Sequence, residues 1–477
     1  MTPNETSPQV ETTRESLWSV GRRELVIGIV LTITLVAFEA MSVATVMPEV
    51  KEDLGGLALY GWVFAGFSLA SLAGVVVAGL LVDRKGLAFP YVVGLGMFSG
   101  GLVVGGAATS MEMLVVGRVL QGFGAGAVPA MSYAAIARGV PASLRPKMFA
   151  VMSTAWVVPG LVGPVAALAI EHALSWRAVF LALLPVVAIA LVVTLPALRR
   201  LDRDLQVSRV NRTPEKRLRD RARLGQIGLL VLAVGAILYA SSVSLWAVVA
   251  ALSIFGLGVG GYALRNLLPA GSLRFKAGVP AAISIRALLT FAFFAADAYI
   301  PLAVVDGRGG EPWMGGLALT ASALLWSTGS WQQARLVGSV GPRKLCQYGF
   351  SAMAVGAATL VAMAAGGPVW LVVAAWAIGG YGIGLAYAPI SVTVLGETKA
   401  GEEGELSSSL QLTDGLGITL GTGLGGWIVA FGDSQNWQVS SSVTLVFLMA
   451  GSAAIAGAVA SGRLPRQLSA GAQLGNS

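Results

Sequence analysis

The sequence predicts an all-α integral membrane protein made of two six-helix bundles and an inserted helical hairpin. Of its 477 residues, 55% are hydrophobic and only 12% are charged, about half of the roughly 25% that is usual in soluble domains. Apolar runs of about 20 residues, the length that crosses a bilayer as a helix, recur along the whole chain. The 62 glycines fit this class, because glycine is commoner in membrane helices than in soluble ones.

The N-terminal half contains six of these runs. Residues 1–23 are polar and are expected to form a cytoplasmic tail, with no signal-peptide core before the first span. An N-terminal bundle over residues 24–198 then follows, with spans predicted at 24–47, 58–82, 89–109, 112–138, 147–170 and 176–198.

A basic segment over residues 199–226 is expected to be a cytoplasmic linker. From Arg199 to Arg223 it holds ten Lys or Arg and four acids, a density that suits contact with the anionic lipid of the inner leaflet rather than with nucleic acid. The apolar stretch 227–264 comes next. As one helix it would be about 55 Å long, nearly twice the ~30 Å hydrocarbon core. Its central serines favour a hairpin of two spans, 227–243 and 245–264.

The C-terminal bundle covers residues 277–461 and precedes a cytoplasmic tail, 462–477. Its spans are predicted at 277–304, 313–335, 346–366, 369–395, 405–432 and 438–461, which brings the total to fourteen. The predicted inner loops of this half are basic, whereas the outer loops hold only Arg308, beside Asp306 and Glu311. The positive-inside rule therefore supports fourteen spans, or twelve if the hairpin does not cross, in a cell membrane with both termini cytoplasmic.

The two halves resemble copies of each other. "LLVDRKGLAF" follows the second span of the first half, and "RLVGSVGPRK" follows the second span of the last block, so that Gly86 and Gly341 align. Such repeats are typical of secondary transporters, in which the transport site lies near the membrane midplane between the halves.

The loop after the second span carries the most specific motif. Gly79, Asp83, Arg84 and Gly86 resemble the "G-x-x-x-D-R-x-G" loop of the major facilitator superfamily. The resemblance implies a gating loop in which Asp83 pairs with a cation across the two halves. Gly79 is expected to allow close helix packing and Gly86 to allow the turn. The alternative is topology alone, because any short inner loop attracts basic residues.

Three further motifs resemble patterns of the same superfamily, the first of them that of its drug:proton antiporters. "FEAMSVATVMP" has Glu39 nine residues before Pro48, as in the antiporter pattern "D-x-T-x-x-x-x-A-x-P" but with Glu for Asp. "GRVLQGFGAGA" supplies Arg118, Gln121 and Gly122 in the pattern "R-x-x-Q-G". "PGLVGPVAAL" holds Gly163 and Pro164, similar to the exporter motif "G-P-x-x-G-G". Trp62 and "SWRAVF" (Trp176, Arg177, Phe180) look like the fourteen-helix drug exporters.

The resemblance implies proton-coupled antiport: export of hydrophobic or cationic small molecules by alternating access, in a bacterial-type multidrug efflux protein. The implied partners are the cargo, protons and membrane lipid, with a monomer as the working unit and no cofactor. The residues themselves argue against an enzyme or a metal site, because His172 and Cys346 are the only histidine and cysteine and no Walker sequence is present.

Two charged residues lie deep in the first bundle. Glu39 is about eight residues and Arg118 about six from the outer ends of their spans, which puts both roughly 9–12 Å below the outer surface. Burial favours the neutral form of a carboxyl group, and a neighbouring guanidinium favours the charged form. A Glu39 balanced between these influences could carry the coupled proton. The alternative is a fixed ion pair that only holds two helices together.

The last block has charged residues of its own. Arg286 and Asp414 lie at similar depths and are expected to pair, chiefly as a structural contact. Asp297 has no basic residue at its depth and is a second candidate for handling a proton or cation. Alternatively, Asp297 is a polar residue at the edge of its helix, in contact with water from outside the membrane.

Aromatic side chains could line the cargo cavity, because flat polarisable walls suit lipophilic cations. The candidates, taken together with Gln121, are Phe38, Trp156, Trp326, Trp331, Tyr381 and Tyr387. Any one of them could instead face lipid or pack between helices. A ladder of Gly417, Gly421 and Gly425 predicts a flat packing face on the span 405–432.

Two other functions remain as alternatives. One is export of a lipid or glycolipid by the same fold. The other is a membrane sensor that transports nothing, although its linker and tail are too short to hold a folded signalling domain.

Overall fold

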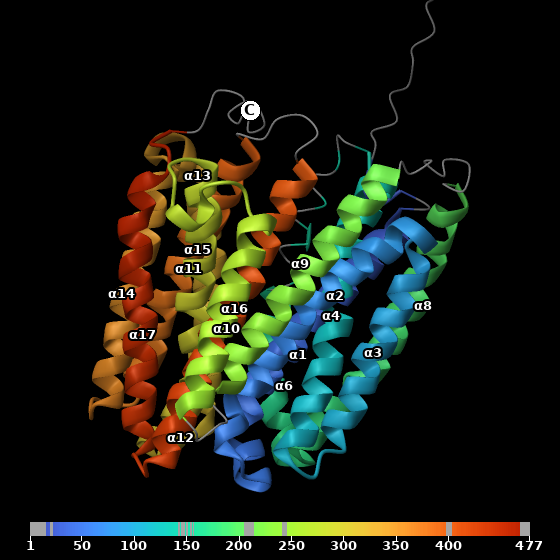
Figure 1. Cartoon of the computed structure of the whole chain (residues 1–477). Coiled ribbons are helices and arrows are strands. Elements are labelled where there is room, and N and C mark those ends of the chain that lie inside the picture. Colours follow the sequence, from blue (N-terminus) through green and yellow to red (C-terminus); the bar gives the residue numbers. More distant parts are fainter. Residues whose placement is uncertain are drawn as a thin grey trace, which may run out of the picture.

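The computed structural model describes residues 16–19, 22–141, 144, 148, 151–152, 155, 157–204, 214–240, 246–396 and 403–467. All regular elements in these ranges are helices, most of them long and running side by side (Figure 1). The first half consists of α1 (Arg23–Leu54), α2 (Tyr60–Lys85), α3 (Ala88–Gly106), α4 (Met111–Gly139), α6 (Val157–Ala173), α7 (Trp176–Leu181) and α8 (Leu184–Asp204).

The inserted hairpin is α9 (Pro214–Tyr239) and α10 (Trp246–Leu267). The second half consists of α11 (Val279–Asp297), α12 (Ile300–Arg308), α13 (Pro312–Val340), α14 (Pro342–Ala364), α15 (Leu371–Gly396), α16 (Glu403–Ser434) and α17 (Val439–Ala460). Within each half the helices pack closely, notably α2 and α3 on α4 in the first half, and α13 and α14 on α15 in the second.

Within the described ranges, 12 helical segments are long and apolar enough to cross a membrane. The α6 helix is apolar but shorter, and α13 is not among the 12. Gln332, Gln333 and several hydroxyl side chains lower the hydropathy of α13. Length and composition therefore support 12 spans, and crossing by α6 and α13 stays a prediction.

The basic segment predicted as a cytoplasmic linker over 199–226 is largely helical where the structure describes it. The α8 helix continues to Asp204 and α9 begins at Pro214, so most of the charged residues extend helices instead of forming a loop. Lys and Arg are good helix formers, and proline is well suited to a first helical position. The end of an apolar run in this sequence therefore does not mark the end of the helix.

The repeat is visible at its two aligned glycines. Gly86 and Gly341 both have φ of 83°, in the left-handed region that glycine enters without steric cost. Each ends a long helix and begins the next one after a tight turn. The same turn geometry at equivalent positions agrees with an internal repeat.

The glycine ladder on α16 packs against α11 as the spacing predicted. Gly417 lies next to Ala287 and Thr290, and Gly421 next to Phe291. A Cβ atom at 421 would lie 2.7 Å from the Phe291 carbonyl oxygen. The close approach of the two backbones therefore needs a residue without a side chain.

We expect Gly421→Ala to destabilise the protein by about 1–3 kcal/mol, because the added methyl group forces α16 away from α11. Gly258→Ala on α10 is the matched control, since a Cβ there would meet nothing within 4 Å. Thermal unfolding in detergent measures both. Equal melting temperatures for the two variants would contradict the packing argument.

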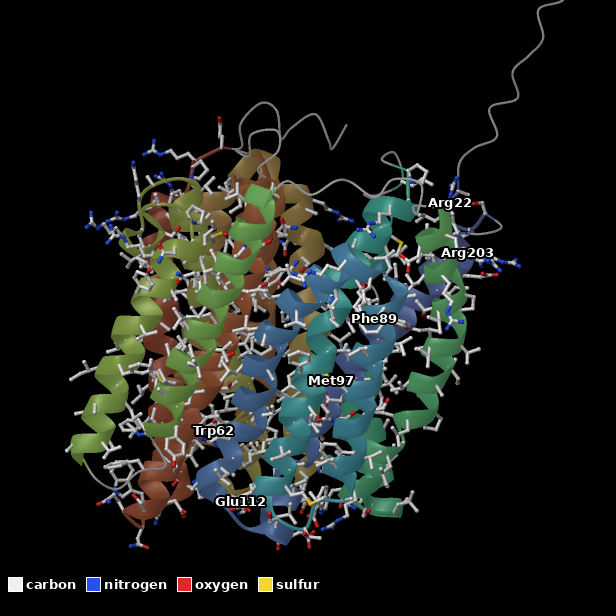
Figure 2. All side chains as sticks on the ribbon, turned by 45° about the vertical axis from the view of Figure 1, so that its right-hand side comes forward. Arg22, Trp62, Phe89, Met97, Glu112 and Arg203 are labelled. Atoms are coloured by element: carbon white, nitrogen blue, oxygen red, sulfur yellow. The ribbon has the colours of Figure 1, made fainter. Side chains whose placement is uncertain are left out.

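The two ends of the molecule differ in charge. Arg22 and Arg203 lie at one end and Glu112 at the other (Figure 2). We call the first the basic end; Arg274, Arg343 and Arg463 belong to it. We call the second the acidic end, where Glu52, Asp53 and Glu171 lie near Glu49 and Asp306 of α12 lies beside Lys51 at the end of α1. The positive-inside rule predicts that the basic end is cytoplasmic.

Candidate functional site

A buried ion pair joins the helices of the first half. Arg118 on α4 pairs with Glu39 on α1, and their side chains are only 3% and 0% exposed. Arg118 also donates from Nε to the Val63 carbonyl on α2 at 3.0 Å, and its guanidinium lies 4.3 Å from the centroid of the Phe67 ring. One guanidinium thus links α1, α2 and α4.

Gln121 contacts this pair in the present conformation. Its Oε1 accepts a hydrogen bond from Arg118 Nη1 at 2.9 Å, and the residue is fully buried. Residues three apart on a helix share a face, which explains the contact with Arg118. A place for Gln121 in the cargo cavity stays a prediction. In the described part of the structure, neither Gln121 Nε2 nor Glu39 Oε2 has a hydrogen-bond partner.

A second ion pair joins three helices of the other half. Arg286 on α11 binds Asp414 on α16 through two nitrogens, one of them Nη2 at 3.0 Å from Oδ2. Tyr387 on α15 donates its hydroxyl to the same Oδ2 at 2.8 Å. Its ring centroid lies 3.1 Å from the guanidinium carbon, and its carbonyl accepts from Arg286 Nη1 at 2.6 Å. These contacts satisfy both charged partners, as the structural interpretation of this pair requires.

A chain of aromatic rings connects that pair to Asp297. Trp326 on α13 lies 5.7 Å from Tyr387 and 5.3 Å from Phe293, which stacks on Trp376 at 4.8 Å. The Trp376 indole donates to Asp297 Oδ1 at 2.6 Å. Asp297 therefore has a neutral partner, and the acid remains a candidate for proton handling. Nothing in its sequence context pointed to Trp376, because the two residues are 79 positions apart.

The other predicted cavity aromatics are scattered. Phe38 is half-buried where α1 meets α6, near Gly163. Tyr381 donates to Gln332 on α13. Trp331 is 72% exposed on α13, and Trp156 lies outside the described residues. A shared cargo wall formed by all of these residues stays a prediction.

The gating loop agrees only partly with its expected packing. Gly86 makes the turn, as predicted. A Cβ at Gly79 would meet no atom within 4 Å. Gly79 is therefore not at a close helix contact in this conformation, and the prediction of close packing there is wrong. Arg84 is exposed, and the side chain of Asp83 lies outside the described part. Asp202 of α8, which the sequence analysis missed, accepts hydrogen bonds from the backbone N–H groups of Leu87 at 2.7 Å and Ala88 at 2.9 Å.

Gly163 and Pro164 lie where the two halves meet on α6. A Cβ at Gly163 would be 3.2 Å from Met41 on α1. Pro164 packs against Gly316 of α13, at 3.4 Å from its Cβ position. This motif therefore shapes a contact between α1, α6 and the opposite half.

The halves are also held together at the acidic end. Lys51 at the end of α1 forms an ion pair with Asp306 of α12, with side chains 22% and 18% exposed. Tyr60 and Tyr299 meet with ring centroids 5.6 Å apart, beside the backbone contact of Gly61 with Gly426. These contacts close the acidic end in this conformation.

We expect Lys51→Glu to loosen that closure, because two acids would then face each other. A partly exposed pair such as this one contributes up to about 1 kcal/mol, or about fivefold in population. Labelling of Thr45→Cys, buried beside Gly316, by a membrane-impermeant maleimide in a Cys346→Ser background reports the change. The charge swap Lys51→Glu/Asp306→Lys should restore slow labelling. An unchanged rate in the single variant would refute a role for the pair in closure.

Comparison with known proteins gives the family. The sequence profile of the Major Facilitator Superfamily matches residues 29–422. The chain is 22% identical over 417 residues to the multidrug efflux pump SdrM of Staphylococcus aureus (strain N315), covering 85% of this chain and 89% of that protein. It is 30% identical over 167 residues to multidrug resistance protein 3 of Bacillus subtilis (strain 168), covering 35% of this chain and 33% of that protein. It thus spans most of one relative and about a third of the other.

The fold has counterparts among solved structures. The POT family transporter PepTSo is similar with a TM-score of 0.66 at 14% sequence identity, over 92% of this chain and 97% of that chain. At that identity the likeness shows the fold alone. The helices, the apolar spans and the profile match agree that this chain is an all-α integral membrane protein that belongs to the Major Facilitator Superfamily.

Proposed function

We propose that the protein is a proton-coupled exporter of hydrophobic or cationic small molecules, working by alternating access in the cell membrane with both termini cytoplasmic. The observation that carries the proposal is the fully buried Glu39–Arg118 pair with its unpaired carboxylate oxygen. The names of the curated relatives support the direction and cargo class. In this proposal all fourteen predicted spans cross the membrane. The protein works as a monomer.

The coupling follows from the energetics of the pair. A charged group inside the membrane is costly unless it is paired. Protonation of Glu39 removes one charge of the pair and frees Arg118 to seek other acceptors, such as Gln121 Oε1 and the Val63 carbonyl, which it already contacts. Proton uptake at Glu39 therefore loosens α1 from α4. Reforming the pair after proton release pulls the helices together again.

The closed acidic end sets the direction of loading. With the basic end cytoplasmic, this conformation is shut towards the outside by the Lys51–Asp306 pair and the α2–α16 contact. Cargo then binds from the cytoplasm or the inner leaflet and leaves when the acidic end opens. The rings from Tyr387 to Trp376 are packed on one another in this conformation. We propose that they offer flat surfaces to a lipophilic cation once the halves move apart.

Transport in proteoliposomes tests the proposal. The purified protein is reconstituted with an imposed pH gradient, and uptake or release of a lipophilic cationic dye is followed together with internal pH. We expect dye movement against its gradient that consumes the pH gradient and stops with a protonophore. Accumulation that ignores the pH gradient would overturn proton coupling, and movement of labelled lipid without dye would favour the lipid exporter.

A further inference from the structure

The inserted hairpin contacts the rest of the protein mainly at one place. The α9 helix packs on α2 of the first half and α16 of the second, while α10 packs mainly on α9. The two halves meet along two seams, α2 with α16 and α6 with α13. The hairpin therefore covers the α2–α16 seam and makes no comparable contact with α6 or α13.

One face of α9 is built for this contact. Ile227, Leu230, Val234 and Leu238 recur every three or four residues and are all buried, as one face of a helix must be. Gly235 brings the backbone close to Leu69 of α2, whose Cδ2 lies 3.7 Å from the Cβ position. The opposite face presents Leu232 outward, 63% exposed.

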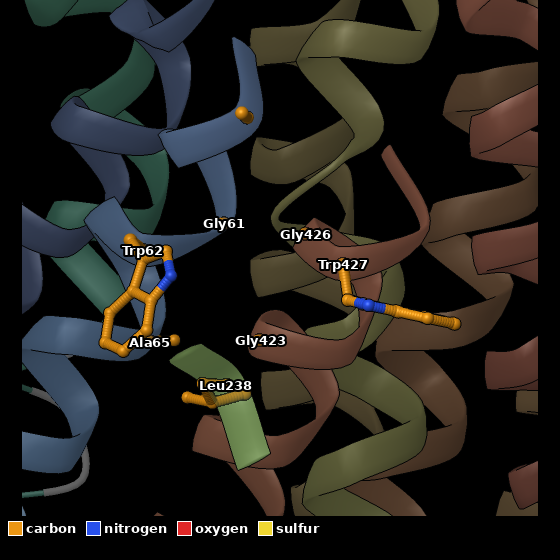
Figure 3. Close-up of a pocket in the computed structure, with 8 residues that line it drawn as sticks. Gly61, Trp62, Ala65, Leu238, Gly423, Gly426 and Trp427 are labelled. Carbon is orange, nitrogen blue, oxygen red and sulfur yellow. The ribbon is translucent and has the colours of Figure 1, made fainter. Parts of the chain in front are cut away.

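Leu238 enters a crevice between the two halves. The crevice is lined by Ala58, Gly61, Trp62 and Ala65 of the first half, by Gly423, Gly426 and Trp427 of α16, and by Leu238 itself. Figure 3 shows Leu238 beside Gly423, with Ala65 and Trp62 across the gap. A Cβ at Gly423 would meet the Leu238 methyl groups, so the missing side chain at 423 provides the space that Leu238 fills.

We propose that α9 is a lateral seal on the α2–α16 seam, with Leu238 as its plug, which keeps lipid chains and bilayer-dissolved compounds out of the path between the halves. The seam needs such a seal because its own contact relies on glycines, Gly61 against Gly426, which leave little side-chain cover. The hairpin is thus a specificity element: it determines which membrane-dissolved molecules reach the transport path on this side. This goes beyond the proposed function and does not depend on proton coupling.

Cysteine labelling tests the seal, because Cys346 is the only native cysteine. In a Cys346→Ser background, Ala65→Cys is exposed in proteoliposomes to pyrene maleimide dissolved in the bilayer. We expect slow labelling with Leu238 present and about tenfold faster labelling in Leu238→Ala, which corresponds to about 1.4 kcal/mol less stable closure. Leu232→Ala is the matched control on the lipid-facing side of α9 and should leave the rate unchanged.

A second variant guards against misfolding. Gly423→Ala should push Leu238 out of the crevice and raise the labelling rate of Ala65→Cys in the same direction, with folding of every variant checked by size exclusion and thermal unfolding. Two results would overturn the seal. One is the same labelling rate of Ala65→Cys in folded protein with Leu238 intact, with Leu238→Ala and with Gly423→Ala. The other is fast labelling while Leu238 is intact. The assay uses neither cargo nor a pH gradient, so a failure of the export proposal would leave its result intact.

Discussion

Glu39→Gln should abolish uphill, proton-driven export while leaving downhill movement of the same cargo measurable. Glutamine keeps the shape of the side chain but cannot exchange a proton, so the pH gradient can no longer bias the two conformations. The expected result is dye flux in proteoliposomes that no longer responds to the imposed gradient. Wild-type rates of gradient-driven export per folded Glu39→Gln molecule would contradict the role of Glu39.

The loss of gradient-driven export in Glu39→Gln must be distinguished from a loss of protein stability. Removing one partner of a buried pair costs about 3–5 kcal/mol because the other charge is left uncompensated, here the guanidinium of Arg118. The double variant Glu39→Gln/Arg118→Gln removes both charges. It should recover much of the thermal stability and still lack coupling. If the double variant regains gradient-driven export, the pair only holds α1 to α4.

Arg286→Ala should be the most destabilising single change in the second half. It leaves Asp414 without the two hydrogen bonds that it accepts from Arg286 and removes the cation from the Tyr387 ring. Asp414 is 19% exposed and keeps the hydrogen bond from Tyr387, so the roughly 3–5 kcal/mol for breaking a fully buried pair is the upper limit of the cost. Thermal unfolding and the yield of monodisperse protein measure the loss.

A double variant that removes both charges distinguishes a structural role of the Arg286–Asp414 pair from a role in proton coupling. Arg286→Met/Asp414→Leu replaces both charges with apolar groups of similar size, which is often close to neutral for stability. We expect this double variant to fold and to retain gradient-driven export, because the contacts of this pair are fully satisfied. Export that is lost in the folded double variant would instead assign Asp414 to proton coupling beside Glu39.

The position of Glu39 illustrates how far sequence reasoning reaches. Counting residues from the ends of two apolar spans put Glu39 and Arg118 at one depth, and depth along a helix follows directly from its rise per residue. The ion pair is present in the structure. The same count could not reveal that Gln121 completes the pair, because the side of α4 that faces α1 depends on packing.

The ion pair between Lys51 and Asp306 had no counterpart in the sequence. These residues are 255 positions apart and belong to opposite halves. The same holds for Trp376 with Asp297 and for Leu238 with Gly423. Each contact depends on how whole helices are arranged, and the sequence of an apolar span does not indicate which helices pack against it.

The sequence by itself determined the membrane class, the order of most spans, the repeat and the charge difference between the two ends, because hydropathy, helix length and charge asymmetry act locally along the chain. Only the tertiary structure decided which half-to-half contacts close the acidic end, where the basic segment remains helical, and that α9 lies over the α2–α16 seam. Those features depend on side chains from distant helices meeting in space, and lipid-facing and protein-facing apolar residues look alike in one dimension.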